Sequence, residues 1–248
     1  MTAGDSAGEA AVVKPVLAES EVASGNVSST TAGFLESESD VGEGLRAVGT
    51  RLRLERKDGR LRTLAVVSSV QGEGKTSVAL GLAAAFARVG GKVLLIDADL
   101  RRRDVCRSLG IEPTRGLAEW LEGSLEPVPV RRVATGSFYV LAAGLDQCRP
   151  EQLGSPRMPL LLTAAEHSFD PVILDCAPLL PVADSLELRD SVAGFLMVVR
   201  ARFTPRRAVR RAASLLQREK LVGMVLNAES SSLSKRRRYT YGYGYKTR

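Results

Sequence analysis

The chain has 248 residues, 44% of them hydrophobic, and a formal net charge of +7. This length predicts one sizeable domain with a buried core and leaves little room for a second. No stretch approaches the ~18 consecutive apolar residues of a membrane span, and the N-terminus is acidic where a signal peptide would be basic, so we expect a cytoplasmic protein. The odd number of cysteines, without CxxC spacing, and the single histidine argue against disulfide frameworks and zinc sites.

The N-terminal segment, residues 1–40, is rich in small and polar residues and carries seven acids against one lysine. It has no sustained apolar periodicity, so we predict a disordered acidic arm. The next stretch, VGEGLRAVGTRLRLE, spaces its apolar residues as a helix does, although Gly44 and Gly49 weaken it. We therefore predict a domain over residues 41–230 that begins with a short helix.

Six short apolar runs follow, most of them separated by segments of helical character: TLAVVSSV, KVLLIDADL, SFYVLAAG, FDPVILDC, AGFLMVVR and LVGMVLN. Strands of near-continuous hydrophobicity that alternate with helices are typical of a parallel sheet covered on both faces. We therefore predict an α/β fold, a doubly wound, mainly parallel sheet with helices on both faces.

The segment TPRRAVRRAASLLQRE is predicted to be a helix that Thr204 caps, with Pro205 at its first position. Its arginines on neighbouring turns, Arg206, Arg207, Arg210 and Arg211, form a basic face. The simplest interpretation of that face is a solvated surface.

The strongest chemical signal is a phosphate-binding loop between a strand and a helix. In such a loop backbone N–H groups and the positive end of the helix face phosphate oxygens, Lys75 adds a mobile charge, and the Thr76 hydroxyl can hold Mg²⁺. Ser77 stands where a dinucleotide fingerprint has its third glycine, so a triphosphate is favoured over a nicotinamide cofactor. We predict that the nucleotide is bound by Gly72, Glu73, Gly74, Lys75, Thr76 and Ser77.

Three carboxylates stand at the ends of predicted strands. Asp97 and Asp99 end LLIDADLRR, and Asp175 ends VILD. Ligands bind at the carboxyl edge of such sheets, so all three side chains should face the phosphate loop. Carboxylates placed this close repel one another, which makes sense where Mg²⁺ and a proton from a phosphoryl acceptor are handled.

The chain resembles the bacterial tyrosine kinases of capsular and exopolysaccharide synthesis. The matching residues run in order over about residues 42–248: SSVQGEGKTS, VLLIDADLRR, VILDCAPLLPVADS, VVRARFTPRRAV, VLN and a C-terminal tyrosine cluster. The standard Walker A pattern has glycine where Ser69 stands. The resemblance implies a P-loop ATPase-like kinase that uses ATP and Mg²⁺ to phosphorylate tyrosines in its own tail or a neighbour's.

The resemblance also implies a role for each residue of a catalytic set, Lys75, Asp97, Asp99 and Asp175. Lys75 and the loop amides would bind the β- and γ-phosphates. Thr76, Asp99 and Asp175 would support the metal, and Asp97 would accept the tyrosine proton. By the same resemblance Asn227, after the last strand, would contact the adenine; otherwise it caps that strand.

The tail, residues 231–248, is basic and carries alternating tyrosines among residues that cannot build a core: Tyr239, Tyr241, Tyr243 and Tyr245. By the resemblance these are the autophosphorylation sites. Intervening glycines keep the segment pliable enough to enter an active site.

The resemblance further implies partners. Glu43 and Arg46 match the family's subunit-contact pattern Glu-x-x-Arg-x-x-Arg, although Gly49 replaces its second arginine. We expect a homo-oligomer that receives the tyrosine tail of a neighbouring subunit. The membrane-spanning half of some family members is absent, so we also expect a membrane-anchored activator of the polysaccharide copolymerase type, which would hold the protein at the inner face of the membrane.

Other departures from the family flank the site: Arg103 replaces a usual proline, and Cys106 stands where a histidine is frequent. We expect these to change loop rigidity and to leave the chemistry intact.

Two alternatives remain open. A ParA/MinD-like partitioning ATPase without tyrosine kinase activity shares the fold and the aspartate motifs, but it carries a signature lysine where Val70 stands. A nucleic-acid-binding module would use the basic and aromatic residues of the tail. The motifs elsewhere do not need nucleic acid, so we expect no such partner.

Overall fold

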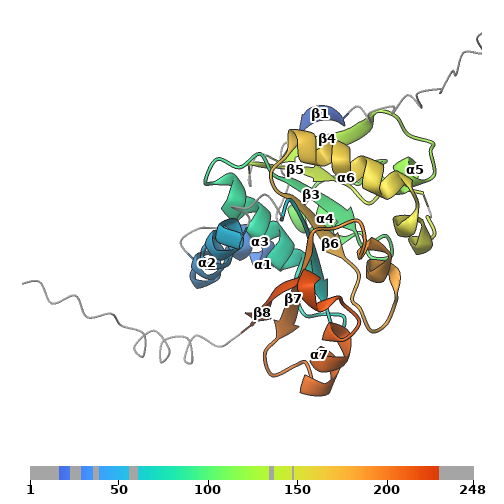
Figure 1. Cartoon of the computed structure of the whole chain (residues 1–248). Coiled ribbons are helices and arrows are strands. Elements are labelled where there is room, and N and C mark those ends of the chain that lie inside the picture. The colour runs from blue at the N-terminus through green and yellow to red at the C-terminus, as the bar shows by residue number, and fades with distance from the viewer. Residues whose placement is uncertain are drawn as a thin grey trace, which may run out of the picture.

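The computed structural model describes residues 17–22, 29–35, 39–55, 61–133, 137–146 and 148–228. This part contains an eight-stranded sheet with the order β1-β4-β5-β3-β6-β2-β7-β8 (Figure 1). Neighbouring strands are parallel except for the antiparallel pair β4 and β5. The strands are β1 (Leu17–Val22), β2 (Thr63–Ser68), β3 (Leu94–Ala98), β4 (Val128–Val133), β5 (Phe138–Leu141), β6 (Val172–Cys176), β7 (Gly194–Arg200) and β8 (Leu221–Asn227).

Helices cover both faces of this sheet. The α-helices are α1 (Ser29–Leu35), α2 (Asp40–Glu55), α3 (Lys75–Ala87), α4 (Asp104–Leu109), α5 (Leu117–Leu121), α6 (Arg157–Ser168) and α7 (Arg206–Ala213). Short 3-10 helices are η2 (Pro150–Gly154), η3 (Asp184–Leu188) and η4 (Arg218–Lys220). Figure 1 shows α1, α2 and α3 together on one side of the sheet, and α5 and α6 on the other.

Two hydrophobic cores result, because alternate residues of each strand face opposite sides. In β2, Val67 belongs to the core under α5, α6 and α7, whereas Val66 belongs to the core under α1 to α4. In β3, Ile96 and Leu95 divide between the two cores in the same way. The predicted doubly wound α/β fold with a mainly parallel sheet is therefore confirmed.

All six predicted strands are present, but the sequence did not reveal β4. Its run VPVRRV contains a proline and two arginines, which hide the alternation of buried valines. Arg131 is nevertheless buried, because its guanidinium donates to the carbonyl oxygen of Glu112 at 2.8 Å and contacts the Cys106 sulfur at 3.3 Å.

The structure differs from the predicted disordered arm, residues 1–40, at two segments. β1 pairs in parallel with β4, and Glu19 on it forms an exposed ion pair of 2.6 Å with Lys92. α1 packs on α3, with Thr31 and Leu35 buried. Both segments are too short and too polar for their sequences alone to predict a strand or a helix. β1 is ordered by the edge of the sheet, and α1 by the face of α3 on which it packs.

The predicted leading helix is longer than expected. α2 has 16 residues and packs on α3 with Leu45 and Leu52 buried. Gly49 lies in this contact, where an added Cβ would meet the Cβ of Ala85 at an ordinary 3.8 Å. Packing on α3 therefore outweighs the low helix propensity of the two glycines.

The prediction that Thr204 caps the arginine-rich helix is wrong. α7 begins after Pro205 and has no side-chain cap, whereas the Thr204 hydroxyl donates to the carboxylate of Glu73 in the phosphate loop. In the described part of the chain, no helix is both long enough and apolar enough to cross a membrane.

The helix pair α2 and α3 provides a matched test of this packing. Gly49→Ala adds a methyl group in an ordinary contact and removes a poor helix former, so we expect unfolding to cost about 0.5–1 kcal/mol more. Gly81→Ala places a Cβ 2.3 Å from the Leu45 side chain and 3.0 Å from the Phe34 carbonyl oxygen, so we expect a loss of about 1–3 kcal/mol. Urea unfolding measures both, and equal effects of the two substitutions would contradict this packing.

Candidate functional site

The phosphate loop joins β2 to α3 and takes the conformation that phosphate loops need. Gly72 and Gly74 have φ angles of 83° and 88°, in the left-handed region that favours glycine. α3 begins at Lys75, and Thr76 and Ser77 are half-buried in its first turn. The N–H groups of this turn have no partner within the helix and point toward the loop, so they can receive phosphate oxygens.

Glu73, predicted to bind the nucleotide, uses its side chain within the protein. Its buried carboxylate accepts hydrogen bonds from the backbone N–H of Val70 at 2.6 Å and from the hydroxyl of Thr204. On the same side, the Arg200 guanidinium donates to the Gly72 carbonyl oxygen at 3.1 Å. The turn between β7 and α7 therefore holds the loop in shape, and only the backbone of Glu73 remains for a ligand.

Asn227 lies at the end of β8 against the same loop. Its Nδ2 donates to the Glu73 carbonyl oxygen at 2.9 Å, and its Oδ1 accepts from the Ala228 N–H at 2.9 Å. A Cβ on Gly74 would stand only 2.2 Å from this Nδ2. Asn227 thus fixes the loop and also requires glycine at position 74, whereas its predicted contact with adenine remains a proposal.

Lys75 sits between two carboxylates at the carboxyl edge of the sheet. Its Nζ lies 2.8 Å from Asp99 Oδ2 and 3.9 Å from Asp175 Oδ1, and all three side chains are buried. Burial alone would lower the pKa of Lys75, but the charges of Asp175 and Asp99 outweigh it, so the pKa is raised. The ammonium group is therefore charged and held where the loop opens.

Asp175 differs from the other charged groups of the site because it is buried without hydrogen bonds in the described residues. Its side chain is fully buried, and neither carboxylate oxygen has a hydrogen-bond partner in the described residues. Burial raises its pKa to about 6, although Lys75 and the nearby Thr76 hydroxyl, which lies outside hydrogen-bond geometry, oppose the shift. Such an orphaned buried carboxylate fits a divalent cation, the usual partner that would satisfy it.

Asp97 lies directly opposite Asp175 in the parallel register of β3 and β6. It accepts hydrogen bonds from the N–H of Val105 at 3.1 Å and from that of Asp99 at 3.3 Å. Burial, followed by the charge of Asp175, raises its pKa well above the ordinary value of a carboxyl group. The structure therefore brings together all four residues of the predicted catalytic set.

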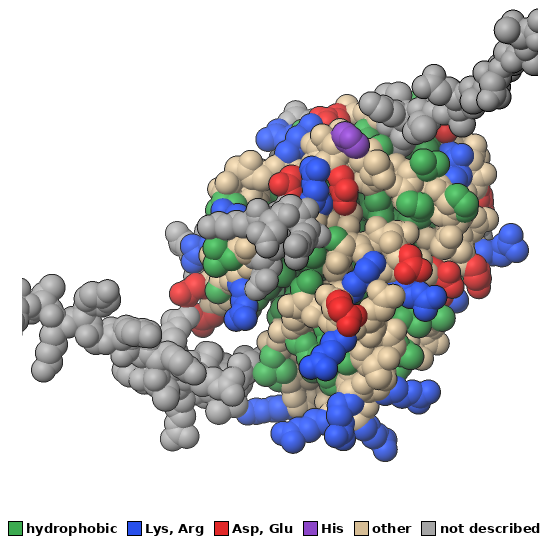
Figure 2. Space-filling model, in the orientation of Figure 1, with side chains coloured by type: hydrophobic (Ala, Val, Ile, Leu, Met, Phe, Trp, Pro, Cys, Tyr) green, Lys and Arg blue, Asp and Glu red, His purple; other side chains and the backbone are tan. Residues whose placement is uncertain are grey.

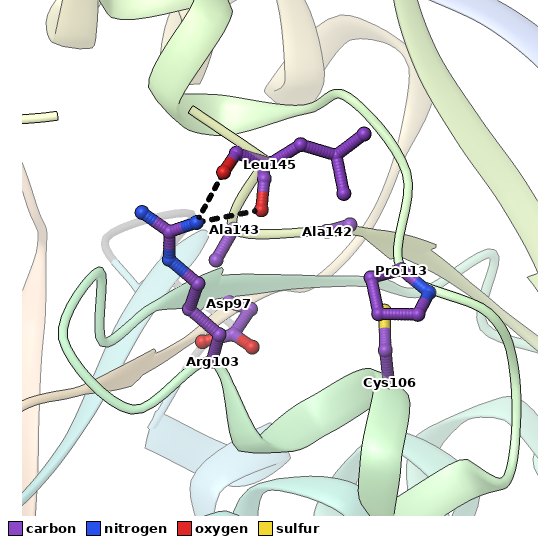
Figure 3. Close-up of a pocket in the computed structure, with 8 residues that line it drawn as sticks. Asp97, Arg103, Cys106, Pro113, Ala142, Ala143 and Leu145 are labelled. Atoms are coloured by element: carbon purple, nitrogen blue, oxygen red, sulfur yellow. Dashed lines mark hydrogen bonds between the residues drawn. The ribbon is translucent and has the colours of Figure 1, made fainter. Parts of the chain in front are cut away.

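A cavity of about 210 Å³ opens beside Asp97 (Figure 3). This volume is smaller than the ~300–1,000 Å³ of typical small-molecule sites, so it suits a single side chain. The other residues that line it are Arg103, Cys106, Pro113, Ala142, Ala143, Gly144 and Leu145.

The two departures flanking the site both line this cavity. Arg103 has a left-handed φ of 53°, and its guanidinium donates to the carbonyl oxygens of Gly144, Leu145 and Asp146 at 3.1, 2.9 and 2.6 Å. It thereby fixes the loop that forms one wall. The thiol of Cys106 is buried, which raises its pKa and keeps it neutral.

The sequence did not predict one further contact of the site. Arg101 and Asp184 form a bidentate ion pair of 2.6 and 3.1 Å, which joins the segment after β3 to the segment after β6. Asp184 follows the VILD strand in the sequence, and this position was the only feature from which a role at the carboxyl edge of the sheet could have been predicted.

The structure does not place every predicted residue in the site. The four tyrosines, Tyr239 to Tyr245, lie outside the described residues. Glu43 and Arg46 are exposed on α2. Within the described ranges, no three His, Cys, Asp or Glu side chains are arranged to hold a metal ion by themselves. A bound ion would therefore need the Thr76 hydroxyl, phosphate oxygens or water beside Asp175.

Comparison with known proteins agrees with this geometry. Residues 64–238 match the model of the CobQ/CobB/MinD/ParA nucleotide binding domain. Tyrosine-protein kinase YwqD of Bacillus subtilis is 34% identical over 209 residues, which cover 82% of this chain and 86% of that protein. The succinoglycan biosynthesis transport protein ExoP of Rhizobium meliloti is 34% identical over 67% of this chain, but the match spans only 22% of ExoP.

Among solved structures, the kinase domain of the Escherichia coli tyrosine kinase ETK superposes with a TM-score of 0.71 at 30% identity. The match covers 86% of this chain and 84% of that domain.

The orphaned carboxylate leads to a pH-dependent prediction. Since its pKa is about 6 in the folded protein against 3.8 ordinarily, the folded state binds more protons than the unfolded state between these values, and stability falls as pH rises through them. Asp175→Asn should remove this loss of stability at high pH. It should raise the free energy of unfolding by roughly 1–3 kcal/mol at pH 8 and by less at pH 5. Urea unfolding of the metal-free protein at both pH values is the check; a less stable variant at pH 8 would show that the charge is satisfied.

Proposed function

The chain belongs to the CobQ/CobB/MinD/ParA nucleotide-binding family and, within it, to the bacterial tyrosine kinases, and from this premise we propose that it is an ATP-dependent protein-tyrosine autokinase. Its substrate would be its own C-terminal cluster, Tyr239, Tyr241, Tyr243 and Tyr245. One observation carries the proposal: a buried carboxylate, Asp97, lines a side-chain-sized cavity and lies directly opposite Asp175, whose oxygens have no hydrogen-bond partner in the described residues.

The nucleotide part of the site is assigned from the loop and its charges. The left-handed loop glycines and the first turn of α3 would receive the phosphate oxygens of ATP. Lys75 would release Asp99 and extend along the β- and γ-phosphates. Asp175, Asp99 and the Thr76 hydroxyl would hold Mg²⁺, which supplies charge neutralisation for phosphoryl transfer. The adenine would lie near Asn227, whose side chain already holds the loop.

The acceptor part of the site is assigned to the cavity. A tyrosine hydroxyl has a pKa of about 10, so its attack is helped by a nearby carboxylate that takes its proton. Asp97 lines the cavity and lies opposite Asp175, so it is the carboxylate that a side chain in the cavity would meet. The phenol oxygen would bond to the γ-phosphorus as its proton passes to Asp97, and ADP would leave.

The cavity walls would decide which side chain enters. Arg103 holds the 144–146 loop through three carbonyl oxygens, so its guanidinium is already engaged. The remaining lining is mainly apolar, which suits an aromatic ring.

We also propose where this activity is used. The similarity to a succinoglycan biosynthesis transport protein supports a role in regulating capsular or exopolysaccharide synthesis. The activator would be a membrane-anchored protein of the polysaccharide copolymerase type, which would hold this chain at the inner face of the membrane. A homo-oligomer would let one subunit's tail enter its neighbour's cavity. Gly49, buried against α3, cannot supply the second arginine of the subunit-contact pattern.

The competing function, a partitioning ATPase without kinase activity, shares the nucleotide loop. The tyrosine cluster and Val70, in place of a signature lysine, favour the kinase. Hydrolysis of ATP without phosphotyrosine would favour the ATPase.

Labelling with Mg-ATP separates these functions. Replacing all four tail tyrosines by Phe should reduce phosphotyrosine on the chain by at least about tenfold, because the acceptor hydroxyls are lost. Tyr139→Phe is the matched control: this tyrosine lies in β5, packed edge-on against Phe169, and its loss should leave labelling unchanged. Mass spectrometry locates the phosphates.

Two further outcomes complete that experiment. Lys75→Met should abolish labelling of the otherwise intact chain while its thermal unfolding stays cooperative. Unchanged labelling of the four-Phe variant would place the acceptor elsewhere in the chain and remove the tail from the proposal.

A further inference from the structure

α7 and the turn before it gather exposed arginines on one surface. We call this set the α7 arginine face: Arg202, Arg206, Arg207, Arg210 and Arg211. Figure 2 shows Lys and Arg side chains crowded at the lower end of the molecule, where α7 lies in Figure 1. α7 itself carries no acid, and none of the five arginines pairs with a carboxylate within the part of the chain that the structure describes.

This arrangement is unfavourable without an anion. Arg206 and Arg210, like Arg207 and Arg211, stand four residues apart on one helix, where like charges repel. Arginine carries a planar fork of donors that matches phosphate oxygens in pairs, which a lysine cannot do. A face made only of arginines therefore suits a ligand with several phosphate groups.

The C-terminal tail begins beside this face. β8 ends at Asn227, whose carbonyl oxygen accepts a hydrogen bond of 2.9 Å from the N–H of Ala201, next to Arg202. Tyr239 follows Ala228 by eleven residues, which span at most about 40 Å when fully extended. α7 is only about 12 Å long, so the tyrosine cluster of the same chain can reach all of the face.

Phosphorylation of the tyrosines would reverse the positive charge of the tail. Its last 15 residues carry six bases and no acid, so before reaction they are repelled by the α7 arginine face. Each phosphotyrosine adds about −1.5 to −2 charges and three acceptor oxygens. The acidic N-terminal segment is less suited to this face, because β1 lies at the opposite edge of the sheet from β8.

We propose that the α7 arginine face is the docking site for the phosphorylated tyrosine cluster of the chain's own tail. This rests on the proposed function, because the kinase reaction makes the ligand. Docking would keep the product tail out of the acceptor cavity. It would also place the product next to the turn that holds the phosphate loop through Thr204 and Arg200.

The test uses the full-length chain with Lys75→Met, which cannot phosphorylate itself. The ligand is a fluorescent synthetic peptide of residues 236–248 that carries four phosphotyrosines, and fluorescence anisotropy measures its binding. We expect it to bind at least about tenfold more tightly than the same peptide without phosphate. Affinity should also fall as salt is raised.

Two quadruple variants in this background separate a specific site from bulk charge. R206Q/R207Q/R210Q/R211Q should weaken phosphopeptide binding by at least about tenfold. R51Q/R53Q/R88Q/R149Q removes the same charge from exposed positions on α2, at the end of α3 and before η2, and should weaken phosphopeptide binding by less than about twofold. Circular dichroism and thermal unfolding confirm that both variants are folded.

Equal loss in the two variants, or equal binding of the two peptides, would overturn the proposal. The proposal would also be overturned if the phosphopeptide did not bind through these four arginines but another ligand did. The ligands to compare are vesicles of phosphatidylglycerol and phosphatidylcholine and a single-stranded oligonucleotide. Because synthesis supplies the phosphates, a negative result here is independent of the labelling experiment that tests the kinase activity.

Discussion

The structure depends on one electrostatic constraint: charged side chains are buried at the carboxyl edge of a parallel sheet. Asp175 is buried with neither oxygen hydrogen-bonded in the described residues, and its ion pair with Lys75 is long, at 3.9 Å, because Lys75 lies 2.8 Å from Asp99. A buried carboxylate without hydrogen bonds costs on the order of a few kcal/mol, which the charge of Lys75 offsets only in part, so the rest of the fold must hold it in place. Two cores, one on each face of β3 and β6, supply that rigidity.

The same constraint explains how the loop is built. The N–H groups that would receive phosphate must stay free of partners inside the loop, so much of the loop's shape is imposed from outside. Glu73 reaches to Thr204 on one side, and Asn227 reaches back to the Glu73 carbonyl oxygen on the other. The loop conformation is therefore tied to the β7–α7 turn and to the end of β8, the two places from which α7 and the C-terminal tail depart.

Much of this architecture follows from local sequence patterns. The six apolar runs predicted the central strands, because strands buried on both faces are hydrophobic throughout. Asp97, Asp99 and Asp175 were predicted to meet, since the carboxyl ends of parallel strands share an edge. β1 and β4 were not found, because their order comes from pairing with neighbours. The roles of Glu73 and Thr204 were missed for a similar reason: their hydrogen bond joins residues 131 positions apart.

Calorimetric titration of ATP at pH 7.5, with and without Mg²⁺, into the wild-type chain and Asp175→Asn tests the central claim most directly. If the orphaned carboxylate is kept for a metal-bound triphosphate, the wild-type chain binds ATP more tightly with Mg²⁺, and the variant loses that gain while still folding. A wild-type chain that gains nothing from Mg²⁺, or a variant that keeps the full gain, would contradict the account.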